Sequence, residues 1–117
     1  MSTLVRIEKK SLDPDGPSLF EHGQERIAIY ELRGVYYATQ DGCTHAKASL
    51  SEGEILEGDL IECPVHGGTF HIPTGRAVDF PCERPIRTYR VADDGEFLVV
   101  DLAQEAACGA GLVERNV

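Results

Sequence analysis

Short alternating or β-branched runs, separated by glycine-containing turns, dominate the pattern of apolar and polar positions along the chain. Helical periodicity is scarce, so the pattern predicts an all-β fold. Each gap between paired runs carries a glycine, which can adopt the positive φ that tight hairpin turns require. A separate run, TLVRIE, predicts a strand near the N-terminus. The paired runs predict four hairpins: 25–32 with 35–39, 54–56 with 60–63, 69–72 with 76–80, and 87–91 with 96–100, the last turning at 93–95.

The remaining segments are typical of connections. SLDPDGPSL at 11–19 predicts a surface loop, and the two prolines of 80–85 predict a stiff connection rather than a strand. The tail from residue 103 predicts either a short helix over about 103–108, ending at Gly109, or a loose end. The 117 residues are enough for a single domain with a modest core.

The chain is strongly acidic, with 20 Asp and Glu against 11 Lys and Arg and a net charge of −9. Nucleic acid and anionic membranes are therefore not expected as partners. A basic patch on another protein fits this charge, and so does a role in solubility alone. No apolar run approaches the roughly 20 residues of a membrane-spanning helix, and the first residues do not resemble a signal peptide. We expect a cytoplasmic protein without a membrane anchor.

Two cysteine–histidine pairs carry the candidate chemistry. They are CTH, with Cys43 and His45, and CPVH, with Cys63 and His66; 17 residues separate the pairs. In a reducing cytosol, metal ligation is a better expectation for such cysteines than disulfides. Two cysteines and two histidines suit a tetrahedral zinc ion or a two-iron two-sulfur cluster.

The spacing within the first pair favours two metal atoms over one. Structural zinc sites usually take paired ligands with two to four intervening residues, whereas only one residue separates Cys43 from His45. Residues i and i+2 of an extended loop point the same way, so their donor atoms are spread along the chain. Cysteine comes first in each pair, so one iron could take both thiolates and the other both imidazoles. A structural zinc module remains the alternative.

The segments CTHAKASLSEGEI and IECPVHGGTF resemble the Rieske signature, and the resemblance covers about residues 2–102. It implies one Rieske-type [2Fe-2S] cluster per chain, with Cys43 and Cys63 on one iron and His45 and His66 on the other. By the same resemblance, the two histidines lie at the tip of the molecule and form the electron exit.

The resemblance also implies the Rieske fold, as a single domain over 1–117. An antiparallel β-sandwich base would comprise about 1–40 and 71–117, and a small inserted cluster-binding subdomain about 41–70. Backbone N–H groups that point at cluster sulfurs stabilise their negative charge, and such convergence needs tightly curved loops. The residues expected to support these loops are Gly42, Pro64, Gly67, Gly68 and Pro81.

Other cysteines and histidines are assigned no ligand role. Cys82 lies in the third, proline-bearing loop, which in the family often covers the cluster, but plain packing is the favoured interpretation. Cys108 falls in the tail. His71 lies on a predicted strand, and His22 is expected in a turn beside a glycine.

Four positions distinguish this chain from the high-potential respiratory and photosynthetic Rieske proteins. Ala48 and Val65 stand where those proteins join the two loops by a disulfide. Gly68 and Phe70 stand where those proteins have serine and tyrosine hydroxyls that donate to cluster sulfurs. Because fewer donors disfavour the added electron, we expect a low potential.

The chain therefore resembles the ferredoxin component of bacterial aromatic-ring dioxygenase systems. That resemblance implies a soluble, monomeric carrier of single electrons, not an enzyme, between a flavin-dependent NAD(P)H reductase and a terminal oxygenase. A small subunit of a reductase, such as assimilatory nitrite reductase, is the alternative. Acidic side chains in the predicted subdomain could steer a basic partner: Glu52, Glu54, Glu57 and Asp59.

Overall fold

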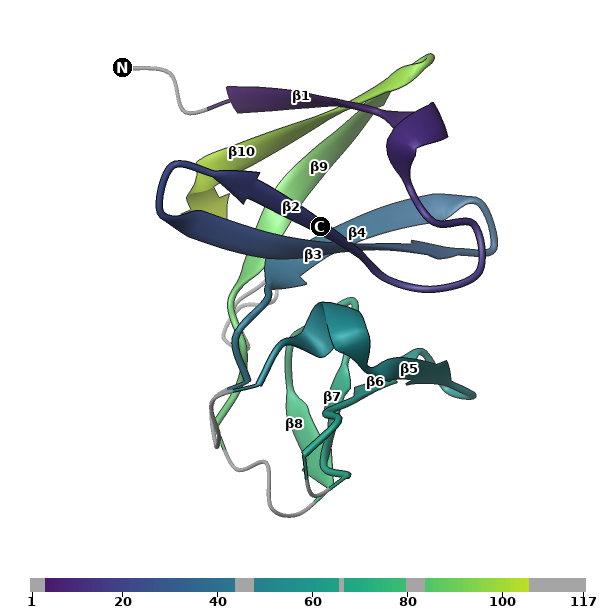
Figure 1. The fold of residues 1–117 in the computed structure, drawn as a ribbon, viewed down its shortest axis with the longest axis vertical. Coiled ribbons are helices and arrows are strands. Elements are labelled where there is room, and N and C mark those ends of the chain that lie inside the picture. The colour runs from purple at the N-terminus through teal and green to yellow at the C-terminus, as the bar shows by residue number, and fades with distance from the viewer. Residues whose placement is uncertain (1–3, 44–47, 66, 80–83, 106–117) are drawn as a thin grey trace.

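The computed structural model describes residues 4–43, 48–65, 67–79 and 84–105, and it places them in two antiparallel sheets (Figure 1). The larger sheet has the strand order β1-β10-β9-β4-β3-β2, and the smaller has β5-β6-β7-β8. The predicted all-β fold is confirmed, since the only helical turns in the described residues are the 3-10 segments η1 (Lys9–Ser11) and η2 (Leu50–Glu52). The strands are β1 (Leu4–Glu8), β2 (Ser18–His22), β3 (Glu25–Leu32), β4 (Val35–Gln40), β5 (Glu54–Leu56), β6 (Leu60–Glu62), β7 (Thr69–His71), β8 (Ala77–Asp79), β9 (Thr88–Asp94) and β10 (Phe97–Glu105).

All four predicted hairpins are confirmed, as β3–β4, β5–β6, β7–β8 and β9–β10. The last turn was predicted too early. Strand β9 continues through Asp94, which pairs with Phe97, so the turn is Gly95-Glu96. The two aspartates read as turn residues, but pairing with β10 keeps them extended.

Two further segments differ in part from what the sequence predicted. The end of the predicted 11–19 loop belongs to β2, an edge strand whose side chains are mostly exposed, which hides its alternation. A helix starting at Ala103 is also excluded, because β10 continues to Glu105 after a register shift and pairs there with Tyr89. Residues 106–117, including Cys108 and Gly109, lie outside the described part of the chain.

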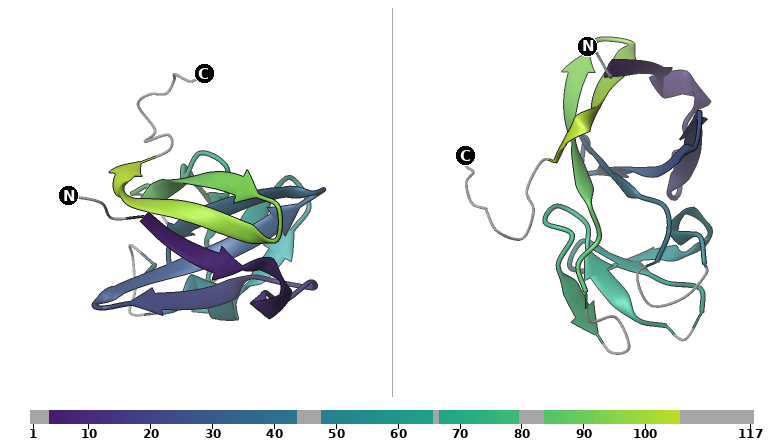
Figure 2. Two further views of the ribbon diagram at one scale, coloured as in Figure 1. Left: turned by 90° about the horizontal axis from the view of Figure 1, so that it is seen from above. Right: turned by 90° about the vertical axis from the view of Figure 1, so that its left-hand side faces the viewer.

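One core lies inside the larger sheet, which curls around it (Figure 2). Every strand of that sheet contributes an apolar side chain, so the curl follows from burying one face of all six strands together. The buried members are Val5, Ile7, Ile27, Ile29, Ala38, Tyr89, Leu98 and Val100, with Phe20 of β2 packed against them.

A second core joins the two sheets through β3. Ile27 and Ile29 face the first core, whereas Ala28, Tyr30 and Leu32 face the second. Strand β3 is therefore buried on both faces, which explains the nearly continuous apolar run IAIY. The other side of this second core comes from the smaller sheet, its loops and the segment that leads into β9, including Leu50, Ile61, Phe70, Ile72 and Ile86.

The smaller sheet extends beyond the 41–70 segment that was expected to bind the cluster. Strand β8 pairs with β7, so the sheet reaches Asp79. The division into base and cluster-binding subdomain stays a prediction, but a boundary at residue 70 would cut this sheet within β7.

An ion pair links the tips of two hairpins, one from each sheet. Arg33 of the β3–β4 turn donates two hydrogen bonds of 2.8 Å to the carboxylate of Asp59 in the β5–β6 turn. These bonds lower the pKa of Asp59. The pair links one corner of the smaller sheet to the larger one at an exposed position, where water screens the attraction.

Within the described residues, no helix is long and apolar enough to cross a membrane.

Candidate metal centre

The two loops that carry Cys43 and Cys63 follow β4 and β6, and they meet in the second core. Cys63 is 1% exposed and Cys43 is 9% exposed, and neither forms a disulfide. The Cys63 thiol interacts directly with that of Cys43. Two cysteines that lie 20 residues apart in the sequence are thus brought side by side, as the pairing of the motifs predicted.

Each cysteine lies at the base of a loop that closes on itself. The N–H of Cys43 donates to the carbonyl of Ala48 (3.0 Å), and that of Cys63 donates to the carbonyl of Gly68 (2.8 Å). Gly67 has a φ of 75°, a conformation that side chains disfavour, so glycine at this point permits the tight second loop. The expected support from Gly67 therefore has a geometric basis.

The surroundings of Cys63 suit a metal-bound thiolate more than a reactive thiol. Burial raises the pKa of Cys63 to about 11, a hydrogen bond from the backbone of Val65 lowers it, and the neighbouring Cys43 raises it. A thiol in this position stays protonated at neutral pH without a metal. Cys63 would bind a metal as the thiolate, and the Val65 N–H is placed to stabilise the charge of its sulfur.

The other predicted ligands fall outside the described residues. His45, His66, Pro81 and Cys82 belong to segments that the structure does not describe, so their roles stay predictions. The described residues alone contain no group of three or more metal-ligating side chains. They do supply two adjacent, buried cysteines from separate loops, a donor set that fits one iron of a two-iron cluster.

Positions that distinguish the high-potential proteins are part of this site. Ala48 and Val65 pack against the second core near the cysteines, and Phe70 is fully buried in it. Gly68 accepts the hydrogen bond that closes the second loop, and Pro64 is exposed directly after Cys63. No side-chain hydroxyl is therefore available at residues 68 and 70.

His71, which is expected to have no ligand role, makes a contact within the β7–β8 hairpin. Its Nδ1 lies 2.9 Å from the hydroxyl of Thr74 in the β7–β8 turn. Burial lowers its pKa, and the charge of Arg76 adds to this effect, while Asp59 opposes it. His22, on the exposed edge strand β2, is solvent-exposed.

His71→Gln is expected to make stability less dependent on pH. Because the folded state lowers the pKa of His71, the unfolded state binds more protons, and stability falls as the pH drops below the ordinary value of about 6.5. Glutamine removes this contribution. The free energy of unfolding of H71Q should therefore fall less between about pH 7.5 and about pH 5.5 than that of the wild type. His22→Gln controls for removing one histidine. An unchanged slope in H71Q, or a loss of visible colour, would contradict the assignment.

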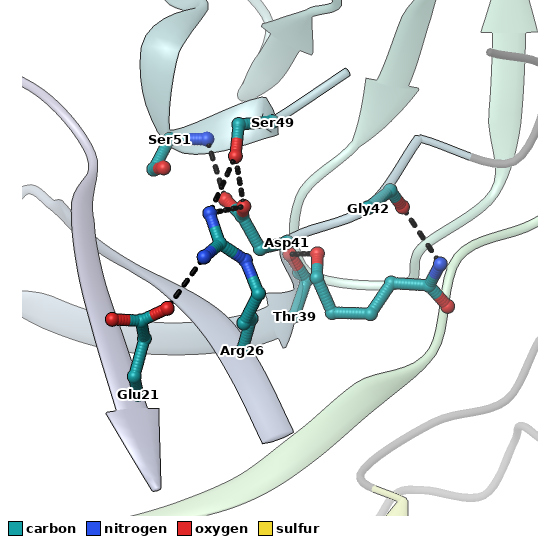
Figure 3. A network of polar contacts seen from close by, with 8 residues as sticks. Glu21, Arg26, Thr39, Asp41, Gly42, Ser49 and Ser51 are labelled. Atoms are coloured by element: carbon teal, nitrogen blue, oxygen red, sulfur yellow. Dashed lines mark hydrogen bonds and ion pairs between the residues drawn. The ribbon is translucent and has the colours of Figure 1, made fainter. Parts of the chain in front are cut away.

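Sequence reasoning missed a network of polar contacts around a buried aspartate beside the first loop (Figure 3). Asp41, only 1% exposed, precedes the Gly42-Cys43 pair and contacts Ser49, Ser51 and Arg26. The only signal was an aspartate next to a glycine, which reads as a turn. Serines and an aspartate in one loop are typical of a solvated segment, but here the partly buried Ser49 and Ser51 cover the buried Asp41.

Comparison with known proteins identifies relatives that are similar to this chain in sequence and in fold. The Rieske [2Fe-2S] domain family matches residues 2–90. The biphenyl dioxygenase ferredoxin subunit of Pseudomonas sp. (strain KKS102) is 38% identical over 94 residues, covering 80% of this chain and 86% of that protein. The solved ferredoxin of carbazole 1,9a-dioxygenase from Nocardioides aromaticivorans IC177 is 34% identical, with a TM-score of 0.80 over 86% of this chain and 98% of its own. A chain in a complex of reduced oxygenase and oxidized ferredoxin in carbazole 1,9a-dioxygenase is also 34% identical, with a TM-score of 0.77 over 86% and 94% of the two chains.

Proposed function

Because the chain belongs to the Rieske [2Fe-2S] family, we propose that it carries single electrons to the terminal oxygenase of an aromatic-ring dioxygenase system. The observation that carries the proposal is the buried pair of Cys43 and Cys63, held by two closed loops in a chain whose relatives are named as dioxygenase ferredoxins. The chain itself is an electron carrier, and catalysis belongs to its partner.

We propose that the cysteines and the histidines of the site bind different irons of the cluster. Cys43 and Cys63 would hold one iron, and we propose that His45 and His66 hold the other and form the electron exit. The bound cluster supplies a centre that accepts and releases one electron. The protein keeps the thiolates away from water, and the Val65 N–H is placed to stabilise sulfur charge. We further propose that a flavin-dependent NAD(P)H reductase loads the electron.

A redox titration is expected to give a low potential, near the lower end of about −150 mV for Rieske centres. The physical reason is the lack of side-chain hydroxyls at Gly68 and Phe70, which leaves fewer donors to stabilise the extra negative charge of the reduced state. A clearly positive midpoint, measured on the isolated holoprotein, would contradict this expectation.

Three exposed glutamates of the smaller sheet and its approach, Glu52, Glu54 and Glu57, could steer the partner. The fourth acidic residue expected to contribute, Asp59, is held by Arg33 in a two-bond ion pair, so its charge is largely offset. Steering therefore falls on the glutamates, which carry no ion pair among those found in the described residues.

Stopped-flow reduction of a terminal oxygenase by the reduced ferredoxin tests the proposal. The second-order rate should fall steeply between low and physiological salt, because attraction between exposed charges is screened. Glu54→Gln with Glu57→Gln should slow the low-salt rate and flatten its salt dependence. Glu96→Gln, in the β9–β10 turn at the far end of the molecule, is the matched control (Figure 1). Absence of electron transfer to any such oxygenase would overturn the function.

Colour separates the cluster from the zinc alternative. A two-iron cluster gives a reddish-brown protein and, after reduction, an electron paramagnetic resonance signal, whereas a zinc protein is colourless.

We also propose that the chain acts as a cytoplasmic monomer. The large exposed apolar side chains of the described residues, Leu4, Leu19, Val35 and Val78, lie singly on four different strands.

A further inference from the structure

Asp41 lies where the chain leaves β4 and enters the first cysteine loop, and its carboxylate is almost completely buried. One carboxylate oxygen accepts a hydrogen bond from the backbone N–H of Ser51 (2.8 Å). The other accepts from the Ser49 hydroxyl and from Arg26 Nη2, which is 3.5 Å away (Figure 3). Side chains from β3 and from the segment after the loop thus converge on one buried charge.

The backbone of Asp41 closes the same point of the chain. Its N–H donates to the carbonyl of Arg26 (3.0 Å), and its carbonyl accepts from the N–H of Leu50 (2.7 Å). The next pairs continue this ladder inward: Gly42 bridges Ser49, and Cys43 N–H donates to Ala48. Both ends of the loop from residue 42 to residue 48 are therefore fastened to Asp41, two residues before the first ligand.

The negative charge of Asp41 is only partly offset. Arg26 lies 3.5 Å from it, but the same guanidinium lies 2.5 Å from the exposed carboxylate of Glu21. The Arg26 side chain is 49% exposed, so water screens much of its charge. The Asp41 side chain is buried, where a charge acts over longer distances. Within the core that contains both cysteines, burial raises the pKa of Tyr30, its hydrogen bond with Thr39 lowers it, and the Asp41 charge raises it by a smaller amount.

We propose that Asp41 is a positioning residue for the cluster: it fastens the first ligand loop, and its buried charge holds the reduction potential down while Arg26 opposes that effect. The inference rests on the proposed cluster. It adds a determinant of potential that is distinct from the missing hydroxyls at residues 68 and 70. An added electron would meet the uncompensated part of the Asp41 charge.

Redox titration of two single variants tests the charge. Asp41→Asn keeps an oxygen for the Ser51 N–H and an amide for Ser49 while removing the charge. The equilibrium constant for reduction should therefore increase about tenfold, which raises the reduction potential by about 59 mV for one electron. Arg26→Gln leaves Asp41 without its cation and should shift the potential in the opposite direction. Glu21→Gln, which removes the exposed partner of the same arginine, is the matched control and should shift it least. Shifts of D41N and R26Q in the same direction, or no shift in D41N, would overturn the charge role.

Cluster retention tests the positioning. Asp41→Ala removes every hydrogen bond that the Asp41 side chain makes at the base of the loop, so the visible absorption should decay about tenfold faster than in wild type, whereas D41N should decay nearly as slowly as wild type. If D41A does not fold, Ser49→Ala removes one of the bonds and should still accelerate the decay. Decay of D41A, or of S49A in its place, at the wild-type rate would overturn the positioning role. Both measurements use the isolated holoprotein, so they stand or fall separately from electron transfer to an oxygenase.

Discussion

Cys63→Ser is expected to abolish the cluster altogether. The Cys63 thiol is buried beside that of Cys43, and we propose that both thiolates bind the same iron of a two-iron cluster. A serine hydroxyl is a harder, more weakly binding ligand for such iron than a thiolate, and no other described cysteine lies at hand to replace it. Protein purified after iron and sulfide reconstitution should lack visible absorption and the reduced-state paramagnetic signal.

The two remaining cysteines provide the matched controls. Cys82→Ser and Cys108→Ser make the same chemical change at positions expected to be packing and tail residues, so both proteins should keep a full complement of iron. A coloured C63S protein would remove the buried pair from the ligand set. Loss of the cluster in C82S would instead add that residue to the site.

Gly75→Ala is expected to produce the largest loss of stability among the substitutions considered. Gly75 turns the chain between β7 and β8 with a φ of 78°, and an alanine Cβ there would lie 2.3 Å from the carbonyl oxygen of Ile86. The same glycine accepts a hydrogen bond from the Ile86 N–H (2.9 Å). Alanine must therefore push apart the turn and the segment that enters β9, so we expect a loss of about 3 kcal/mol or more in the free energy of unfolding.

Gly34→Ala separates the contact from the dihedral angle. Gly34 has a similar φ of 86°, but no atom lies within 4 Å of the position that its Cβ would take. Only the conformational penalty of about 1 kcal/mol should remain there. Denaturant unfolding followed by circular dichroism should rank wild type first, G34A second and G75A last. Equal losses in the two variants would show that the Ile86 contact is unimportant.

The hairpins and the cysteine pairing could be predicted from the sequence because their signals are local. Glycines at 34, 58, 75 and 95 mark turns, and two short motifs mark the ligand loops. The described structure places Cys43 beside Cys63 as those motifs implied. The ligand role of the two histidines stays a prediction, because both lie outside the described residues.

What the sequence could not show depends on contacts between distant segments. Strand β2 is mostly exposed and is recognised as a strand only by its pairing with β3. The membership of β8 in the smaller sheet follows from its pairing with β7. Asp41 reads as an ordinary turn residue, since its burial depends on β3 and on residues 49–51 folding over it.

Strand β3 limits how this electron carrier can be re-engineered. Its Ala28, Tyr30 and Leu32 line the core that holds both cysteines, while its other face completes the larger sheet. Transplanting the two ligand loops into another scaffold would therefore leave one wall of the cysteine environment behind, and water would enter. A successful graft has to bring a strand with the same inward face and also Ile86, so the smallest transferable unit spans at least residues 25 to 86.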